Sequence, residues 1–161
     1  MGSRPKPHAT PATQLLNRHK VPFTVWHYDY VERGGAKRAW EQLGLAEESV
    51  IKTLVMEDDE GVPLLILMHG PHRVSTKELA RQIGCKKIQP CSPEKAFKVT
   101  GYAVGGTSPF GTRHQLRVFA ESTIRDLDEV FINGGAKGFL VGISTEDLER
   151  VLEPTYVNVA I

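Results

Sequence analysis

A lysine stands within a mostly apolar run, Val50 to Met56. If this run is a strand, its two-residue alternation places Lys52 on the same face as Val50, Leu54 and Met56. Burying an ammonium group without a partner is costly, so Lys52 should either reach the edge of the sheet or face a cavity that receives an anion. A lysine that protects a strand edge from aggregation fits the pattern as well, and both interpretations stay open.

A glycine-rich stretch, residues 101–111, is the second candidate for chemistry, with four glycines, Ser108 and Pro109 in eleven residues. Glycines let backbone N–H groups approach a ligand, and consecutive amides can bind a carboxylate, a phosphate or a developing oxyanion. The stretch matches no Walker A, G-x-G-x-x-G or G-x-S-x-G motif, so nothing marks Ser108 as a nucleophile. A surface loop without a ligand is the alternative. A second glycine turn is predicted after a strand, at residues 133–138.

The other reactive side chains show no metal-binding or catalytic spacing. The six histidines form no H-E-x-x-H or similar pattern, and we expect them at surface or strand-end positions. Cys85 and Cys91 fit neither C-x-x-C nor a zinc ribbon, so they are predicted to be free thiols. We therefore expect neither a metal nor a cofactor.

The composition indicates an ordinary globular chain of 161 residues, with 40% hydrophobic and 24% charged residues. Residues 71–120 carry nine Lys and Arg against two acidic residues, which predicts a surface that grips a phosphate backbone unless these residues only solvate helix faces. No apolar run approaches the roughly 20 residues of a membrane helix, and no signal sequence opens the chain, so a cytoplasmic location is expected. Residues 1–9 are predicted to be a flexible tail.

Secondary structure signals alternate along the chain. Capping residues and prolines predict helices at residues 10–20, 36–43, 75–84, from 92 onward and at 144–152. Strands are predicted at residues 23–28, 49–56, 62–69, 116–119, 129–132, 139–143 and 156–160. The runs 49–56 and 62–69, joined by an acidic loop with a glycine, should form a hairpin. Helices and strands mixed in this way predict one α/β or α+β domain around a mixed sheet.

Taken together, the motifs resemble the YbaK/EbsC aminoacyl-tRNA editing family over residues 10–160. The motifs that carry the resemblance are Thr10-Pro11-Ala12, Pro22-Phe23, Tyr28-Asp29, Ile51-Lys52-Thr53-Leu54, Gly101-Tyr102-x-Val104-Gly105-Gly106-x-Ser108-Pro109-x-Gly111, and Gly134-Gly135 before Gly138. The similarity is closest to the YbaK branch, the Cys-tRNA(Pro) deacylases. It implies a single α/β (α+β) domain, the aminoacyl-tRNA synthetase-associated fold, whose mixed and partly barrel-like sheet is flanked by helices and which spans residues 10–161.

The resemblance also assigns roles to individual residues. Lys52 matches the essential lysine that would hold the terminal adenosine of tRNA, while Gly105 and Gly106 match the loop whose amides face the ester carbonyl. The implied substrate-binding residues are Tyr28, Gly101, Tyr102, Thr107, Ser108, Pro109, Gly134 and Gly135. Water or a group on the substrate attacks the ester, without a side-chain nucleophile. The implied partners are the 3′ end of mischarged tRNA(Pro) and prolyl-tRNA synthetase.

The chain departs from the family pattern on one wall of the expected pocket. Lys137-Gly138-Phe139 replaces the usual basic-Gly-Leu sequence, and the stretch from Leu140 onward lacks the family's acidic residue. Thr107 stands where a larger apolar residue is common, which alters the expected aminoacyl pocket. The alternatives are a deacylase for Ala- or Ser-charged tRNA, a non-catalytic nucleotide or small-molecule binding module, and a protein with no pocket, in which Lys52 would be exposed and far from Gly105.

Overall fold

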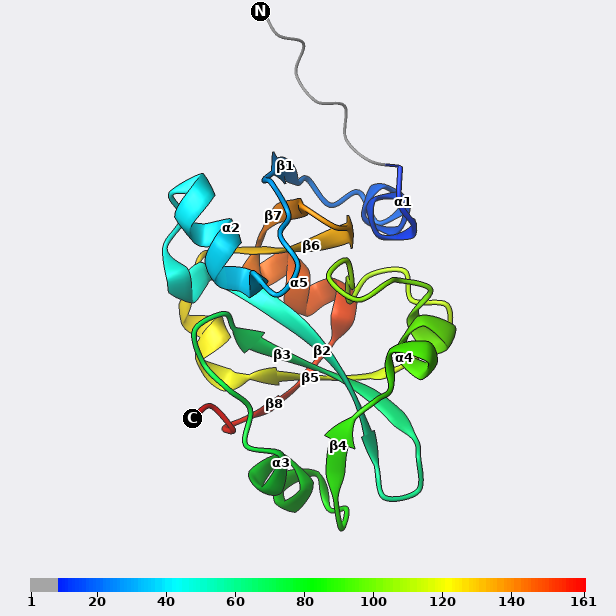
Figure 1. The fold of residues 1–161 in the computed structure, drawn as a ribbon. Coiled ribbons are helices and arrows are strands. Elements are labelled where there is room, and N and C mark those ends of the chain that lie inside the picture. The colour runs from blue at the N-terminus through cyan, green and yellow to red at the C-terminus, as the bar shows by residue number, and fades with distance from the viewer. Residues whose placement is uncertain (1–8) are drawn as a thin grey trace, which may run out of the picture.

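An eight-stranded mixed sheet forms the centre of the computed structural model, which describes residues 9–161 (Figure 1). Its strands are β1 Thr24–His27, β2 Val50–Asp58, β3 Pro63–His69, β4 Ile88–Pro90, β5 Arg117–Glu121, β6 Glu129–Ala136, β7 Phe139–Ser144 and β8 Thr155–Val157. Their order is β1-β7-β6-β2-β3-β5-β8, with β4 paired to β2. β2 and β3 form the predicted antiparallel hairpin, while β6 runs parallel to β2 and β5 parallel to β3. The predicted single α/β domain with a mixed sheet is confirmed.

Five α-helices flank this sheet in the described residues: α1 Pro11–Arg18, α2 Gly35–Leu43, α3 Thr76–Ile83, α4 Pro93–Thr100 and α5 Thr145–Leu152. Four of them begin at a predicted cap, because the side chains of Thr10, Ser75, Ser92 and Ser144 each accept a hydrogen bond from a backbone amide of the first turn. The helix positions predicted from capping signals are therefore confirmed. Two 3₁₀ turns, Glu47–Ser49 and Ser122–Asp126, complete the helical elements.

The second glycine turn was predicted wrongly. Strand β6 continues through Gly134 and Gly135 to Ala136, and only Lys137 and Gly138 form the turn into β7. The register shifts between Asn133 and Ala136, which marks a β-bulge. Glycines in a bulge look like a turn in the sequence because both structures need the same backbone freedom. The short strand β4 was also missed, and β8 is three residues long, shorter than predicted.

The twist of β2 divides its side chains among different parts of the core. Val50 packs with Ala39 of α2, Ile51 lies in the main core, and Met56 packs near α3. A strand of nine residues turns its faces progressively because sheets twist. Strict alternation placed Val50, Leu54 and Met56 on one face, whereas Val50 packs against α2 and Leu54 packs with Met56 in the cluster near α3.

The helices leave part of β2 uncovered on one side. In Figure 1, α2 crosses one end of β2 and α4 stands on the opposite side, with the glycine-rich stretch above it. A cavity lined by residues of α2, β2 and α4 opens between them. Within residues 9–161, no helix is long and apolar enough to cross a membrane. The predicted tail lies outside the described residues, apart from Ala9.

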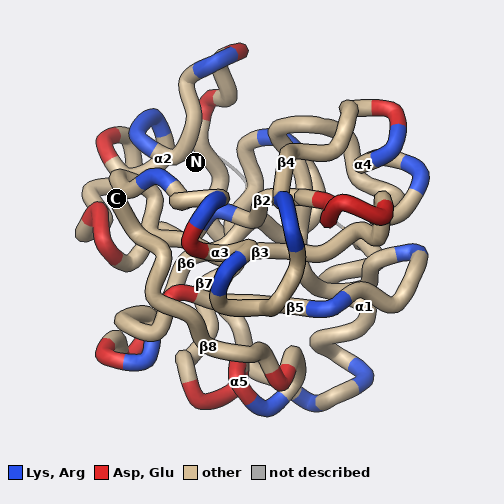
Figure 2. The backbone as a smooth tube through the Cα atoms, turned by 90° about the horizontal axis from the view of Figure 1, so that it is seen from below, with Lys and Arg blue, Asp and Glu red and all other residues tan. Residues whose placement is uncertain are grey.

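The nine basic residues of the 71–120 segment come from several elements, from the loop before α3 to strand β5. Figure 2 shows Lys and Arg distributed around the chain. Three of the nine are held in ion pairs, Lys95 with Glu57, Arg117 with Asp58 and Arg81 with Glu78. The charges of these three residues are therefore offset within the protein. The basic residues outside these pairs need to be considered one by one.

Candidate active site

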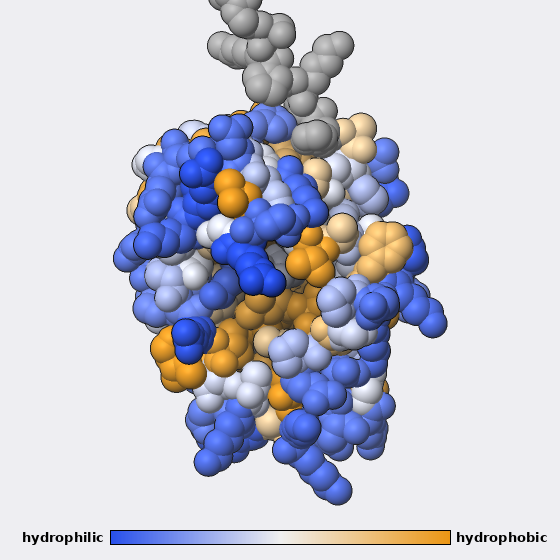
Figure 3. Space-filling view, in the orientation of Figure 1, coloured by the Kyte–Doolittle hydropathy of each residue, from blue (hydrophilic) through white to orange (hydrophobic). Residues whose placement is uncertain are grey.

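The cavity over β2 has a volume of about 590 Å³ and brings together residues far apart in the sequence. Figure 3 shows a hydrophobic hollow in this region, bordered by hydrophilic side chains. Its apolar lining comes from Ala36, Ala39, Val50, Leu54, Val55, Pro93, Ala96, Val104 and Leu140. Lys52 and Gly105 line the same cavity. The alternative of a protein without a pocket, with these two residues far apart, is contradicted.

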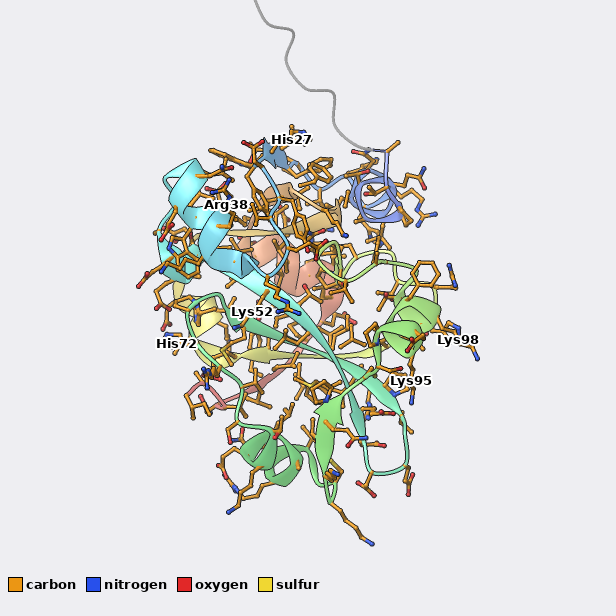
Figure 4. All side chains as sticks on the ribbon, viewed as in Figure 1. His27, Arg38, Lys52, His72, Lys95 and Lys98 are labelled. Atoms are coloured by element: carbon orange, nitrogen blue, oxygen red, sulfur yellow. The ribbon has the colours of Figure 1, made fainter. Side chains whose placement is uncertain are left out.

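Lys52 is one of two basic residues that line this cavity, together with Arg33. It extends from the middle of the molecule in Figure 4, and its Nζ donates a hydrogen bond to the carbonyl of Gly70 at 3.2 Å. Burial lowers the pKa of Lys52 from its usual 10.5, and the nearby charge of Arg73 lowers it further. No acidic side chain forms an ion pair with Lys52 in the described part of the chain. A half-buried ammonium beside a second cation is suited to receive an anionic group.

The peptide group that joins Gly105 to Gly106 is held at both ends. The Gly105 carbonyl accepts from Nδ2 of Asn133 at 3.3 Å, and the Gly106 amide donates to the carbonyl of Ala103 at 2.9 Å. Of the two predicted amide donors, that of Gly106 is therefore engaged. Over residues 9–161, the amides of Gly105 and Thr107 make no hydrogen bond, and both residues line the cavity. Like the amide of Val104, which also lines the cavity and makes no hydrogen bond in that range, these two amides are available donors for a substrate oxygen.

Asn133 connects the glycine-rich stretch to the bulge of β6. Its Oδ1 accepts from the amides of Gly135 at 2.6 Å and Ala136 at 3.2 Å, while its Nδ2 donates to the carbonyls of Gly105 and Ala136. One side chain thus bonds to both glycine segments. The carbonyl of Gly134 accepts from the hydroxyl of Thr10 at 2.6 Å, which ties the same bulge to the start of α1.

Tyr30 packs against the glycine-rich stretch at Gly105. A Cβ at Gly105 would lie 2.4 Å from the Tyr30 hydroxyl, and Gly105 has a φ of +87°. Lys137 lies over the Tyr30 ring at 5.2 Å and pairs with Glu32 at 3.2 Å. The segment after β1 is therefore attached to the β6–β7 turn. Tyr28 also lines the cavity, and burial raises the pKa of its phenol above the usual 10.0.

Only part of the predicted site forms the cavity lining. Lys52, Gly105, Tyr28 and Thr107 line it, whereas the other predicted residues lie behind it: Gly101, Tyr102, Gly106, Ser108, Pro109, Gly134 and Gly135.

The residues behind the lining hold its backbone in place. Tyr102 is 4% exposed and donates to the carbonyl of Phe110 at 2.6 Å, and burial raises its pKa to about 12. The hydroxyl of Ser108 is fully buried and accepts from the Phe110 amide at 3.2 Å. Gly106 packs so closely that an added Cβ would lie 2.9 Å from the backbone nitrogen of Lys137.

Several lining residues were missed from the sequence, namely Asn133, Tyr30, Cys91, Ala36 and Ala39. Signals existed for some of them. Tyr30 follows Tyr28 by two residues, the spacing of one strand face. Asn directly before two glycines is typical of a side chain that bonds the following backbone amides. Nothing in the sequence indicates that α2 would stand over β2.

Cys91 is the thiol in the cavity, which the expectation of a site without nucleophiles did not anticipate. Burial raises the pKa of the Cys91 thiol, and the charge of Glu57 raises it further. A thiol with a raised pKa carries little thiolate and is a poor nucleophile. Both cysteines are free. Among the described residues, no group of three or more His, Cys, Asp and Glu is arranged to hold a metal ion.

The Asn133 contacts lead to a prediction about activity and stability. Replacing Asn133 with alanine should lower the free energy of unfolding by about 1 kcal/mol, because the half-buried backbone groups of Gly135 and Ala136 lose a partner. Asn133→Asp keeps the acceptor for Gly135 and Ala136 but places a carboxylate against the Gly105 carbonyl. We therefore expect Asn133→Asp to fold better than Asn133→Ala and still to lose about tenfold or more in turnover. Thermal unfolding and steady-state kinetics measured on both variants test this, and wild-type kcat in Asn133→Asp would contradict it.

Comparison with known proteins identifies the family of this chain. The family model for the aminoacyl-tRNA editing domain matches residues 34–151. The chain is 24% identical over 147 residues to the Enterococcus faecalis protein named "Putative Cys-tRNA(Pro)/Cys-tRNA(Cys) deacylase EbsC", covering 91% of this chain and 90% of that one. It is 31% identical over 132 residues to a proline–tRNA ligase of Geobacter metallireducens, where 82% of this chain covers 21% of the ligase. The chain thus spans about a fifth of the length of that ligase.

Solved structures share the fold. A crystal structure described as "a putative trans-editing enzyme for prolyl tRNA synthetase" superposes with a TM-score of 0.82 at 21% identity, covering 94% of this chain and 95% of the other. A second structure, the hypothetical protein APE2540, has a TM-score of 0.84 at 17% identity over 94% of this chain and 99% of the other. Because the matched family model spans α2 through α5 and every strand of the cavity floor, this chain belongs to the aminoacyl-tRNA editing domain family.

Proposed function

We propose that this chain is a trans-editing hydrolase that deacylates mischarged aminoacyl-tRNA, with Cys-tRNA(Pro) as its substrate. The observation that carries the proposal is the meeting of Lys52 with the unbonded amides of Gly105 and Thr107 in one largely apolar cavity. Family membership and the name of the Enterococcus faecalis relative support the reaction and the substrate. Residues 10–161 act as one editing domain, in the cytoplasm, on tRNA supplied by prolyl-tRNA synthetase.

Lys52 and the two amides have separate tasks in this proposal. The ammonium of Lys52 holds a phosphate or ribose oxygen of the terminal adenosine, which fixes the ester in the cavity. The amides of Gly105 and Thr107 donate to the ester carbonyl as negative charge develops on its oxygen. Water or a group on the substrate attacks the carbonyl carbon, and the 3′-oxygen of the tRNA leaves with a proton. The raised pKa of Cys91 argues against an acyl-enzyme formed on that thiol.

The aminoacyl side chain would face the apolar wall. The stretch that begins at Leu140 lacks the family's acidic residue, and Leu140 lines the cavity together with Val50 and Ala39. An apolar wall favours a small, weakly polar side chain over one with several hydrogen-bonding groups. A thiol or a methyl group fits this chemistry, while Thr107 offers a hydroxyl at the opposite side of the lining.

Deacylation assays on three substrates test the proposal. Purified protein is mixed with tRNA(Pro) charged with cysteine, alanine or serine, and the loss of each ester is followed against the uncatalysed rate. We expect the cysteinyl ester to be hydrolysed fastest. Equal rates for the cysteinyl and alanyl esters would show that the thiol of the substrate takes no part in the mechanism. A chain that binds the tRNA but releases none of the three amino acids would be a binding module of the same fold.

A further inference from the structure

The last turn of α4 carries an exposed aromatic side chain next to the cavity. Phe97 is 49% exposed, one of the few large hydrophobic residues on the surface of the described chain. Pro93 and Ala96 of the same helix line the cavity. Phe97 lies one turn beyond Pro93 and directly follows Ala96, which places it next to these two residues on α4, outside the lining itself. Folding alone does not explain an exposed phenyl ring beside a binding cavity, which suggests a role in binding.

One cation lies over this ring, and a second basic residue, Lys98, follows Phe97 in the sequence. The guanidinium of Arg113 lies over the Phe97 ring, 5.4 Å from its centre, and its Nη1 donates to the carbonyl of Lys98 at 3.5 Å. The amide of Arg113 donates to the Thr100 carbonyl at 3.1 Å, which fixes this arginine against the end of α4. Lys98 projects outward from α4 in Figure 4. We call Phe97, Lys98 and Arg113 the α4 platform.

The charges of the α4 platform are not neutralised by the protein. From Lys95 to Ala120 the sequence contains no Asp or Glu. Lys95 and Arg117, at the two ends of that stretch, are paired with Glu57 and Asp58. Lys98 and Arg113 form no ion pair within residues 9–161. An unpaired arginine over an exposed aromatic ring, with an unpaired lysine on the same helix turn, is a combination that binds single-stranded nucleic acid, since a base stacks on the ring or the guanidinium while cations contact phosphates.

We propose that the α4 platform binds the unpaired nucleotides that precede the terminal adenosine of tRNA. This inference rests on the proposed function, because it requires the terminal adenosine to occupy the cavity. The strand that leaves the cavity past Pro93 and Ala96 then reaches Phe97, where a base stacks. Arg113 and Lys98 contact the flanking phosphates. Unstacked bases of a single-stranded end are accessible to this kind of contact, unlike the paired bases of the acceptor stem.

Binding of two RNA hairpins tests the inference directly. Both carry the acceptor stem of tRNA(Pro) and a fluorophore, and one has the single-stranded 3′ end whereas the other is blunt. Phe97→Ala should raise the Kd for the hairpin with the single-stranded end about tenfold, as expected for the loss of one stacked base, and leave the blunt hairpin unchanged. Phe97→Trp should retain binding. Arg113→Ala should also weaken binding and make the dependence of log Kd on log salt shallower by about 0.7.

Arg125→Ala is the matched control. Arg125 also lies over an aromatic ring, that of Tyr156 at 4.5 Å, but it does not line the cavity. Its replacement removes the same charge and the same kind of contact and should leave Kd unchanged. Equal weakening by Arg125→Ala and Arg113→Ala would overturn the inference, because the effect would then be one of net charge. Thermal unfolding of each variant confirms that it is folded.

Kinetics separate this inference from the proposed function. In Phe97→Ala, KM for the charged tRNA should rise about tenfold with kcat unchanged, because the platform does not touch the ester. If the wild-type chain hydrolyses none of the charged tRNAs, the proposed function fails. If the wild type is active and Phe97→Ala keeps its Kd and KM, only the platform fails. A Phe97→Ala variant that loses prolyl-tRNA synthetase in pull-down but keeps both constants would make this surface a protein contact and likewise overturn the inference.

Discussion

Replacing Lys52 with alanine is expected to reduce deacylation about 100-fold or more while the protein stays folded. Charge-assisted hydrogen bonds are about twice as strong as neutral ones, and Lys52 is one of the two basic residues in the cavity lining. The loss to the fold is small, since the side chain is half-buried and makes one hydrogen bond, to the Gly70 carbonyl. Steady-state kinetics on charged tRNA and thermal unfolding measure the two effects.

Two further variants identify what Lys52 contributes. Lys52→Gln can still donate to Gly70 but has no charge, so it should be nearly as inactive as Lys52→Ala. Lys37→Ala is the matched control, because Lys37 lies on α2, pairs with Glu41 on the surface and does not line the cavity. It should keep wild-type turnover. Wild-type turnover in Lys52→Ala would refute the assignment of Lys52 to the site.

The pH dependence of the wild-type reaction has a defined direction. Burial and the charge of Arg73 lower the pKa of Lys52, so its ammonium loses the proton at a lower pH than an exposed lysine would. The charged form is present below that pKa. After subtraction of the uncatalysed hydrolysis, the rate should therefore fall as pH rises toward 10.5, and Lys52→Arg, if active, should not show this fall.

Replacing Gly105 with alanine is the second change with a large expected effect. Gly105 has a φ of +87°, which costs an L-residue about 1–2 kcal/mol, and its new Cβ would lie 2.4 Å from the Tyr30 hydroxyl. Either Tyr30 or the glycine-rich stretch must move, and the amide of Gly105 moves with it. Loss of one donor to a developing oxyanion lowers kcat by about 100-fold or more. We expect that loss in kcat together with a modest decrease in thermal stability.

The variant Gly84→Ala is the control, because it introduces similar backbone strain without displacing Tyr30 or the glycine-rich stretch. Gly84 ends α3 with a φ of +82°, and an added Cβ there meets nothing within 4 Å. It should lose a similar amount of stability and keep full activity. If Gly105→Ala and Gly84→Ala behave alike in the deacylation assay, the amide of Gly105 is not part of the mechanism.

Local signals in the sequence predicted most secondary structure. Caps such as Ser75 and Ser144 act over three or four residues, and the β2–β3 hairpin joins neighbouring runs through a short loop. Interactions between residues so close in the sequence leave a pattern that can be recognised without a structure. The bulge at Gly134 and Gly135 was misread because its shape depends on the partner strand and on Asn133.

The candidate site was predicted in its key residues and missed in its surroundings. Lys52 is out of place in an apolar strand, and the density of glycines at 101–111 is unusual, so both attract attention without a structure. Tyr102 and Ser108 belong to the same motif but face the core, because consecutive residues of a loop point in different directions. Asn133 bonds to Gly105 across 28 residues, a contact that no local pattern encodes.

The residue types and their order along the chain were sufficient to predict the family resemblance, the mixed α/β domain and the cation of the proposed mechanism, Lys52. Only the tertiary structure decided which amides remain free, which wall is apolar and which basic residues are already neutralised by Glu57 and Asp58. The physical reason is that each hydrogen-bond donor, acceptor or charged group can serve only a small number of partners. Whether a donor or a charge is available to a ligand depends on what the rest of the folded chain has placed beside it.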